Sequence, residues 1–273
     1  MEGPPREPDA TSRWMRISGE RHLARTTVEA TGVPAALAYV FADARVADAI
    51  FEPLGWTILG SAPVLVRPLR LSFAAERLLP TAARGLVPNV PLVAPFGGKR
   101  RTGVREITTF EPRFTRLWDR FCIDIGVAID RNAAYFGRRI FDRPEGGYRV
   151  FIFEDGDRYA VRAMCIFTVK DGTGYVMELL HDRSVTGMRA ASHLLGIAVR
   201  EMSDAGAEAA VAWSLTHSGS FPIYARHAFV SPPAPLRTKE LRFGACAFDD
   251  ELADIVTKRD RWYLSYLDAD EGV

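Results

Sequence analysis

Cysteine is scarce in this sequence, and the three cysteines present are far apart. Cys122, Cys165 and Cys246 are odd in number and stand mostly beside apolar neighbours. This spacing excludes a disulfide framework and offers no zinc-ligand pattern, so we expect reduced cysteines in the core. No group of carboxylates and histidines has metal-ligand spacing either, and we expect no bound metal.

Long apolar runs and an excess of one charge are also lacking. No stretch approaches the roughly 18 uninterrupted apolar residues of a membrane span, and the opening residues, MEGPPREPDATSR, contain no apolar leader segment. The 35 basic residues nearly balance the 34 acidic ones, which argues against nucleic acid or an anionic membrane as a partner. We therefore expect a cytoplasmic protein with a small-molecule partner.

What the chain does contain is enough apolar material, 48% of 273 residues, for one large domain or for one domain and a fragment. We divide it into a flexible tail over 1–24, a partial domain over 25–70, a linker over 71–104 and a full domain over 105–273. The linker is rich in proline and glycine and carries the basic cluster Lys99–Arg101. Such a cluster beside glycines is more typical of a solvated linker than of a phosphate site.

Hydrophobic periodicity predicts strands and helices that alternate through the full domain, and hence an α/β fold with a mixed sheet covered on both faces. A strand over 35–41, a helix that ends at 54–55 and a further strand precede the linker, which holds one helix over 72–84. In the full domain, strands are predicted over 105–110, 146–156, 158–172, 174–182, 207–215, 240–248 and 261–267. Helices are predicted over 114–121, 128–141, 187–205 and 221–228.

The chain also contains an internal similarity. Residues 32–39 align with 206–213 without a gap, and one deleted residue later 50–56 aligns with 223–229. Two Ala-rich strand and helix units can look alike by chance, but the matching aromatic positions favour a tandem repeat. The first copy then lacks everything equivalent to 105–190. The unpaired strand edges of this first copy then pack on the second domain or pair with another chain, as in a homodimer. The remaining alternative is that the copy is incomplete because of a shortened gene start or expressed fragment.

The aromatic positions carry a resemblance to a known family. Tyr224-Ala-Arg-His-Ala-Phe229 resembles the tyrosine, three-residue spacer, glycine-aromatic signature of the GNAT N-acetyltransferases, and residues 51–56 resemble it again. The resemblance implies an acyl-CoA N-acyltransferase fold and a reaction in which acetyl-CoA acetylates a small amine or amino sugar. The alternative is a degenerate GNAT-like module that has lost catalysis and serves protein association.

The resemblance also implies where acetyl-CoA binds. Two strands, over 174–180 and 207–215, diverge to admit its pantetheine arm, and the helix that follows the first strand receives its diphosphate at the N-terminus. The family prefers Gln or Arg first and Gly or Ala last in this loop, whereas this chain has Ser184 and Arg189. Arg189 either pairs with a phosphate or fills the site. The residues implied to contact acetyl-CoA are Leu179, Leu180, Ser184, Val185, Thr186, Gly187, Met188, Arg189, Ala190 and Ser214.

Glu178 and Tyr224 are the candidate catalytic residues. Glu178 interrupts the apolar run of a central strand, where burial raises the pKa of a carboxyl group toward that of a useful base. Its alternative role is a structural ion pair with Arg162 or Arg183. By resemblance, Tyr224 protonates the departing thiolate; its alternative role is that of a core residue with its hydroxyl near solvent.

The histidines offer weaker candidates. His181 is an alternative base, whereas His193 and His227 fall on predicted helices and are interpreted as packing or surface residues. His217 and Ser218 lack the Gly-x-Ser-x-Gly turn that would indicate nucleophilic catalysis.

Overall fold

The structure is a computed structural model, and it describes residues 13–17, 22–26, 37–78, 86–92, 102–143, 147–156, 160–232 and 241–269. Contacts divide the chain into two units, each drawn from three separate parts of the sequence. The first unit contains residues 1–62, 124–130 and 239–263, and the second contains residues 63–123, 131–238 and 264–273.

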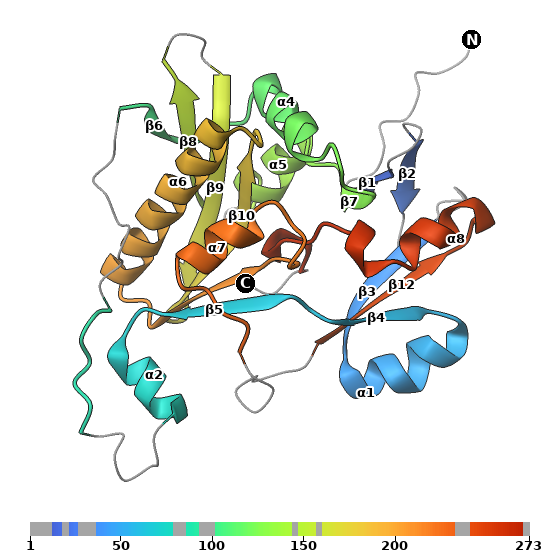
Figure 1. Ribbon diagram of the computed structural model, residues 1–273, viewed down its shortest axis with the longest axis horizontal. Helices are drawn as coiled ribbons and strands as arrows, with labels where there is room; N and C mark the ends of the chain where they lie inside the picture. The colour runs from blue at the N-terminus through green and yellow to red at the C-terminus, as the bar shows by residue number, and fades with distance from the viewer. Residues whose placement is uncertain are drawn as a thin grey trace. The chain divides into compact units, whose positions relative to one another are not determined.

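The first unit holds two antiparallel sheets of three strands each (Figure 1). In one, β1 (Arg13–Ile17) lies between β2 (His22–Thr26) and β7 (Val127–Ile129). In the other, β12 (Leu241–Ala247) lies between β3 (Leu37–Asp43) and β4 (Thr57–Ser61).

Short helical turns link the strands of the first unit. The chain between β3 and β4 forms α1 (Ala44–Val46), the π-helical turn η1 (Ala47–Phe51) and the 3-10 turn η2 (Glu52–Leu54). Gly55 ends this run with a φ of 84°, a left-handed conformation that glycine adopts without strain. After β12 come α8 (Asp250–Val256) and η6 (Arg259–Arg261).

The second unit is built on one mixed sheet of six strands, in the order β5-β11-β10-β9-β8-β6. All neighbouring strands in it are antiparallel except β10 and β11, which run parallel. The strands are β5 (Val64–Pro68), β6 (Val104–Ile107), β8 (Arg149–Asp155), β9 (Ala160–Lys170), β10 (Thr173–His181) and β11 (Ala209–Trp213).

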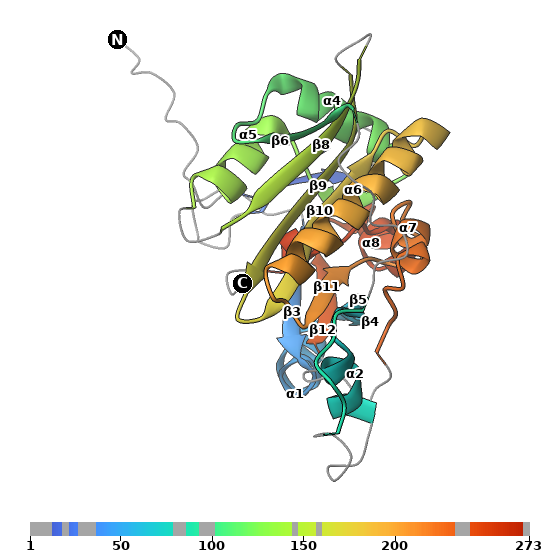
Figure 2. The ribbon, with the colours of Figure 1, turned by 90° about the vertical axis from the view of Figure 1, so that its left-hand side faces the viewer.

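Helices cover both faces of this sheet (Figure 2). The helices on one face are α4 (Pro112–Phe121), α5 (Ala133–Phe136) and the π-helical turn η3 (Gly137–Phe141). Those on the other face are α6 (Val185–Asp204) and the short α7 (Phe221–Arg226). Two further elements are α2 (Leu71–Leu78), which follows β5, and the 3-10 turn η7 (Tyr266–Asp268). A mixed sheet between two helical layers confirms the predicted fold class.

Residue spacing explains how the two layers pack. In α4 the buried residues Phe114, Leu117, Trp118 and Phe121 follow one another at intervals of three, one and three, which places them on one helical face. In α6 small residues such as Ala190, Ala191 and Ala198 alternate with Leu194 and Leu195, so the helix lies close to the sheet. Both helices were expected from this periodicity.

Most predicted elements occur where the sequence placed them, but two segments differ. Residues 261–267 were predicted to be a strand, whereas four consecutive residues from Trp262 to Ser265 are buried and the chain then turns into η7. A strand with one covered face would bury alternate residues instead. Residues 128–141 were predicted to be one helix; the chain instead forms β7, then α5 and η3, because Asn132 caps a new helix there by accepting a bond from the Tyr135 amide at 2.8 Å.

The segments expected to be a tail and a linker also contain ordered elements. β1 and the start of β2 lie within residues 1–24. In the expected linker, α2 follows β5, and the Leu92 amide donates to the Leu69 carbonyl at 2.8 Å. The cluster Lys99–Arg101 lies outside the described residues. Within those residues no helix is both long enough and apolar enough to cross a membrane.

β5 belongs to the same sheet as the predicted full domain, although it precedes residue 105. It pairs with β11 over all five of its residues, from Val64 opposite Trp213 to Pro68 opposite Ala209. The fragment 105–273 would therefore leave β11 as an open edge. β3 and β11 are each followed by a short helix, as the alignment of the two copies requires. This order alone does not test the internal repeat, which stays a prediction.

Candidate functional site

The two parallel strands of the second unit pair over only the first part of β10, because β11 ends at Trp213. β10 pairs with β11 from Thr173 opposite Ala209 to Val176 opposite Ala212, and pairing ends there although β10 continues to His181. At this point the register of β10 against β9 shifts between Val176 and Glu178, so that Met177 is an extra residue. A β-bulge of this kind bends a strand and increases its twist. The bulge lies where pairing with β11 ends, and the divergence expected of these two strands stays a prediction.

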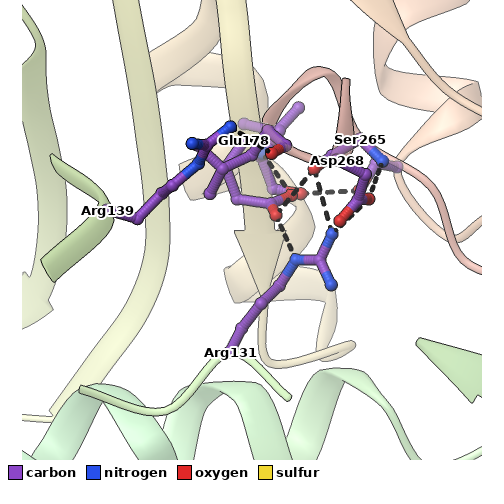
Figure 3. A network of polar contacts seen from close by, with 8 residues as sticks. Arg131, Arg139, Glu178, Ser265 and Asp268 are labelled. Atoms are coloured by element: carbon purple, nitrogen blue, oxygen red, sulfur yellow. Dashed lines mark hydrogen bonds and ion pairs between the residues drawn. The ribbon is translucent and has the colours of Figure 1, made fainter. Parts of the chain in front are cut away.

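Glu178 follows the bulge and is completely buried. Its Oε2 accepts bonds from Arg131 Nε and, at 3.0 Å, from the Ser265 hydroxyl, while its Oε1 accepts from the Leu179 amide at 3.1 Å. The same guanidinium reaches Asp268 Oδ2 at 2.6 Å (Figure 3). Glu178 and Asp268 thus share one arginine.

Local structure fixes Arg131 from two sides. Asn132, the next residue, caps α5, and the amide of Ala133 donates to the Thr115 hydroxyl of α4 at 3.1 Å. The guanidinium carbon lies 5.1 Å from the centre of the Trp118 ring, a cation–π distance. Contacts with α4 and α5 therefore position the guanidinium group of Arg131 next to β10.

The ion pair of Glu178 is the structural alternative that the sequence left open, but the partner differs. Arg162 pairs with Asp155 and Asp182, and Arg183 donates to the Phe121 carbonyl at 2.7 Å. The partner is Arg131, which precedes Glu178 by 47 residues, a separation that no local pattern reveals.

A loop after β11 returns to the half of β10 with which β11 does not pair. The Ser220 hydroxyl donates to the Leu179 carbonyl at 2.7 Å, and His181 Nε2 lies 3.3 Å from the Gly219 carbonyl. Both contacts engage β10 beyond the point where pairing with β11 ends. The loop that follows β11 is thus hydrogen-bonded to β10 at Leu179 and His181.

His181 is a poor candidate for a base in this arrangement. Its Nδ1 accepts the Arg183 amide at 3.1 Å, which leaves Nε2 to carry the proton that faces Gly219. Burial lowers the pKa of His181, and the ring packs edge-on against Phe121 with centres 5.4 Å apart. These contacts of the His181 ring give it a structural role, in which it holds the end of β10 against Gly219 and Phe121.

The first turn of α6 is exposed and capped from within the chain. Ser184 is the N-cap, and its hydroxyl accepts the Gly187 amide at 2.9 Å. Val185 and Thr186 are exposed, and their amides have no acceptor inside the helix because they belong to its first turn. Met188 and Arg189 are also exposed, whereas Ala190 is buried.

Asp182 lies against this turn and is nearly covered. Its Oδ1 accepts the Ser184 amide at 3.1 Å, and its Oδ2 is paired with Arg162 at 2.7 Å. Hydrogen bonds from Ser184 and the charge of Arg162 lower the pKa of Asp182 against the effect of burial. A carboxylate therefore already interacts with the positive end of the helix dipole on its inner side.

Gly187 is required by this contact, and replacing it with alanine is expected to destabilise the protein by about 1 to 3 kcal/mol. An added Cβ would overlap with Asp182 Oδ1 and lie 3.1 Å from the Arg162 carbonyl. Urea denaturation measures the effect, with Gly137→Ala as the control because a Cβ there meets nothing within 4 Å. Equal stability of the two variants would contradict the close contact.

Tyr224 lies on α7 and is buried against Phe229, with ring centres 5.4 Å apart. Burial is the main cause that raises its pKa well above the ordinary value, so the phenol keeps its proton. It belongs to the cluster formed by α6 and the sheet, while Glu178 contacts η7. Both residues therefore lie on or beside β10, and the charge of Glu178 is one of the smaller causes that raise the pKa of Tyr224.

The other predicted site residues are mostly apolar or internally bonded. Leu179 and Leu180 are fully buried in β10, and the Ser214 hydroxyl faces the Leu215 carbonyl at 3.4 Å. His217 is exposed and Ser218 is buried. No group of three or more potential metal ligands occurs in the ranges that the structure describes.

His227, at the end of α7, joins three elements of the second unit. It is fully buried, its Nε2 lies 2.9 Å from the Ser192 hydroxyl of α6, and its carbonyl accepts a bond from Arg67 of β5 at 2.7 Å. Burial first and the charge of Arg67 second lower the pKa of His227 to about 4. The residue was expected to pack or to lie at the surface, and it packs.

This histidine predicts a loss of stability in acid. Because its pKa is about 4 when folded and near 6.5 when unfolded, its contribution is complete above pH 6.5 and lost as the pH falls toward 4. Between pH 7 and pH 4.5 the loss from this group is about 2.5 kcal/mol. Urea denaturation at both pH values should show a smaller loss for His227→Gln than for the natural chain. An equal loss would exclude His227 as its source.

Sequence reasoning missed Arg131, Ser265 and Asp268. Ser265 and Asp268 do carry a local signal, because Ser-x-x-Asp is a capping-box pattern and the structure forms that box at the start of η7. The Ser265 amide donates to Asp268 Oδ2 at 2.8 Å. Their contacts with β10 depend on tertiary structure and have no such signal.

Comparison with known proteins bears on the fold. No family model matches the sequence, and no curated protein does. Among solved structures, N-myristoyltransferase of Saccharomyces cerevisiae with bound myristoyl-CoA is similar over 86% of this chain and 64% of that chain, with a TM-score of 0.52 at 10% identity. The same enzyme with myristoyl-CoA and inhibitors gives a TM-score of 0.52 at 12% identity, over 86% of this chain and 62% of that one.

A GCN5-related N-acetyltransferase from Sphaerobacter thermophilus is similar over 77% of this chain and 59% of that chain, at 11% identity and a TM-score of 0.43. The chain thus spans less than two thirds of the length of these proteins. The second unit has the fold of the GNAT acyl-CoA N-acyltransferases, with its mixed sheet flanked by helices.

Proposed function

We propose that the protein is an acyl-CoA-dependent N-acyltransferase, which transfers the acetyl group of acetyl-CoA to a small amine or amino sugar. The observation that carries the proposal is the end of pairing between β10 and β11 after Val176 and Ala212, at the bulge. In this fold such an end of pairing leaves unpaired backbone groups on β10, and these are suited to the amide groups of a pantetheine arm.

The residues fit the two ends of acetyl-CoA unequally. At the diphosphate end, the exposed amides of Val185 and Thr186 and the exposed Arg189 offer donors and a positive charge. At the thioester end, Ser220 already donates to the Leu179 carbonyl. Binding there requires this hydroxyl to turn away, so we expect the loop 214–220 to move when acetyl-CoA binds.

Transfer to an amine needs a group that accepts its proton and a group that protonates the thiolate. Tyr224 suits the second role because its raised pKa keeps its proton available. Glu178 is the proposed acceptor, and it must exchange one of its present donors for the amine. Glu178→Gln and Tyr224→Phe test the two roles separately, each as a loss of turnover with acetyl-CoA binding retained.

Binding of acetyl-CoA by the whole chain is the test of the proposal. The whole chain is needed because the fragment 105–273 lacks β5. A ligand at about 100 times its dissociation constant adds roughly 2.7 kcal/mol of stability, so the melting temperature should rise clearly. Myristoyl-CoA measured beside it shows whether the slot accepts a longer acyl chain. If neither thioester raised the melting temperature at millimolar concentration, the proposal that the protein is an acyltransferase would be refuted.

A second candidate is a GNAT-like module that has lost catalysis and serves protein association. Two sets of hydrogen bonds favour this function. Both carboxylate oxygens of Glu178 already accept hydrogen bonds, and the Ser220 hydroxyl already donates to the Leu179 carbonyl, so these groups are engaged where catalysis would need them. The edges of β3 and β4 in the first unit have no further strand among the described residues, and they offer a place for pairing with a second copy. Sedimentation that shows a dimer, together with no thioester binding, would support this function.

A further inference from the structure

Arg67 is a buried cation that has no carboxylate partner in the described ranges. The residue is 4% exposed, and its Nη1 donates to the His227 carbonyl at 2.7 Å, which engages one of the five N–H donors of a guanidinium group. Burial lowers the pKa of Arg67 and no charge opposes it, whereas at Arg149 a hydrogen bond to Glu106 is the main cause of a raised pKa. The charge of Arg67 is thus unbalanced within the chain, which is unfavourable for a buried ion.

The strand pairing shows which way Arg67 points. Arg67 lies directly opposite Ala210 in the antiparallel pair of β5 and β11, so the two side chains lie on the same face of the sheet. Ala210 belongs to the apolar cluster of this sheet and α6, as do Leu65 and Leu69, two positions before and after Arg67. Arg67 is therefore a charged residue in an otherwise apolar row that faces α6.

The sequence around the site contains no acidic residue. Asp and Glu are absent from residues 53–75, which include β5, and from residues 209–239, which include β11 and α7. The helices α2 and α6 carry three acids, each of them either paired with Arg149 or exposed: Glu201, Glu76 and Asp204. The missing negative charge therefore does not come from the elements next to Arg67.

The site lies at the edge of the sheet, close to solvent. β5 is the last strand of the sheet in the described part of the chain, and Val66 bonds in both directions to Val230, which is 58% exposed. The remaining nitrogens of Arg67 do not belong to the fully covered side-chain atoms that lack a partner in those ranges, so part of their surface is open. An opening of this size suits a small ligand rather than a peptide.

The charges near Arg67 select the kind of anion. His227 is neutral at physiological pH, because burial first and the charge of Arg67 second lower its pKa to about 4. Arg226 of α7 is exposed, and Arg70 donates to the Ser203 carbonyl, at the end of α6, at 3.2 Å. The single buried cation of these residues balances one negative charge, and its planar fork matches the two oxygens of a carboxylate.

We propose that Arg67 binds the carboxylate of a small monocarboxylic acid at the edge of the sheet, between β5 and the end of α7. A phosphate dianion would bring one negative charge too many. The apolar row of Leu65 and Leu69 favours a short aliphatic body on the ligand. Binding of this acid does not rest on the proposed acyl transfer.

Calorimetric titration of the whole chain with butyrate at neutral pH, in the absence of any thioester, tests the proposal. Butyramide is the matched ligand without charge, and inorganic phosphate is the anion of higher charge. We expect saturable binding of butyrate, much weaker binding of the other two, and a loss of about tenfold to a hundredfold in Arg67→Met. Arg70→Met is the control variant, because Arg70 also donates to a main-chain carbonyl, and it should leave butyrate binding unchanged.

A second variant keeps the test decisive if Arg67→Met does not fold. Arg67→Lys retains the charge and loses the planar fork, so its affinity for butyrate should fall by about threefold to tenfold. Equal affinity for butyrate and butyramide, tighter binding of phosphate, or displacement of butyrate by an equal concentration of chloride would overturn the proposal. So would unchanged affinity in Arg67→Met, or in Arg67→Lys where only that variant folds.

A purely structural role for Arg67, as the residue that holds the end of α7, gives a different result. In that case butyrate leaves the urea midpoint of the natural chain unchanged. The proposal predicts that butyrate raises the midpoint of the natural chain and not that of Arg67→Met, because a ligand stabilises only a folded state that binds it.

The outcomes separate this inference from the proposed function. Butyrate binding that depends on Arg67, without any effect of acetyl-CoA on the melting temperature, would leave the carboxylate site in place and remove the enzyme. Binding of acetyl-CoA together with no saturable binding of butyrate would do the reverse.

Discussion

Replacing Arg131 with methionine is expected to destabilise the protein by about 3 to 5 kcal/mol. The substitution removes the cation that Glu178 and Asp268 share and leaves two carboxylates in a fully buried site. It also removes the charge above the Trp118 ring. Since the free energy of unfolding of a single domain is about 5 to 15 kcal/mol, the substitution removes a large share of it.

Urea denaturation of Arg131→Met, compared with Arg149→Met, measures this effect. Arg149 also joins two carboxylates, Glu106 and Glu201, but its side chain is 36% exposed, so its loss should cost about 1 kcal/mol or less. Adding Glu178→Gln and Asp268→Asn to Arg131→Met should recover part of the stability, because fewer charges then remain buried. Similar losses in the two single variants would show that the network is not buried in solution.

Trp118→Ala should be the second most damaging substitution, with a loss of about 3 to 5 kcal/mol in the free energy of unfolding. Trp118 is completely buried in α4 and packs on Phe121 with ring centres 5.9 Å apart. Its removal leaves a cavity beneath Arg131 and takes away the ring that faces the guanidinium. Both effects act on the same face of the sheet.

Trp118→Phe is the matched control, because it keeps an aromatic ring and most of the volume. We expect it to lose less than half as much stability as Trp118→Ala. Thermal and urea unfolding of both variants give the comparison. If alanine and phenylalanine were equally tolerated, α4 would not be packed against the sheet at this residue.

Elements with strong periodicity could be read from the sequence. The helix over 187–205 and the strands around residues 160–180 correspond to α6, β9 and β10, since their apolar spacing reflects burial that is local to each element. The positions of β10 and β11 as neighbours were also expected, and the two strands pair from Thr173 to Val176 of β10.

What the sequence could not reveal depends on distant residues. β5 joins β11 although 141 positions separate Pro68 from Ala209. Residues 261–267 have the apolar content of a strand, but tertiary packing buries consecutive residues and overrides the β propensity. Glu178 was recognised as an unusual acid in an apolar strand, whereas its partner Arg131 and the turn that holds Asp268 are brought to it only by the fold.

A crystal structure of the whole chain with acetyl-CoA is the most direct test of the central claim. The claim predicts the thioester arm between residues 179–181 of β10 and the loop 214–220, with the Ser220 hydroxyl released from the Leu179 carbonyl and the diphosphate at the amides of Val185 and Thr186. Strands β10 and β11 zipped together beyond Val176, or acetyl-CoA bound at any other place, would contradict it.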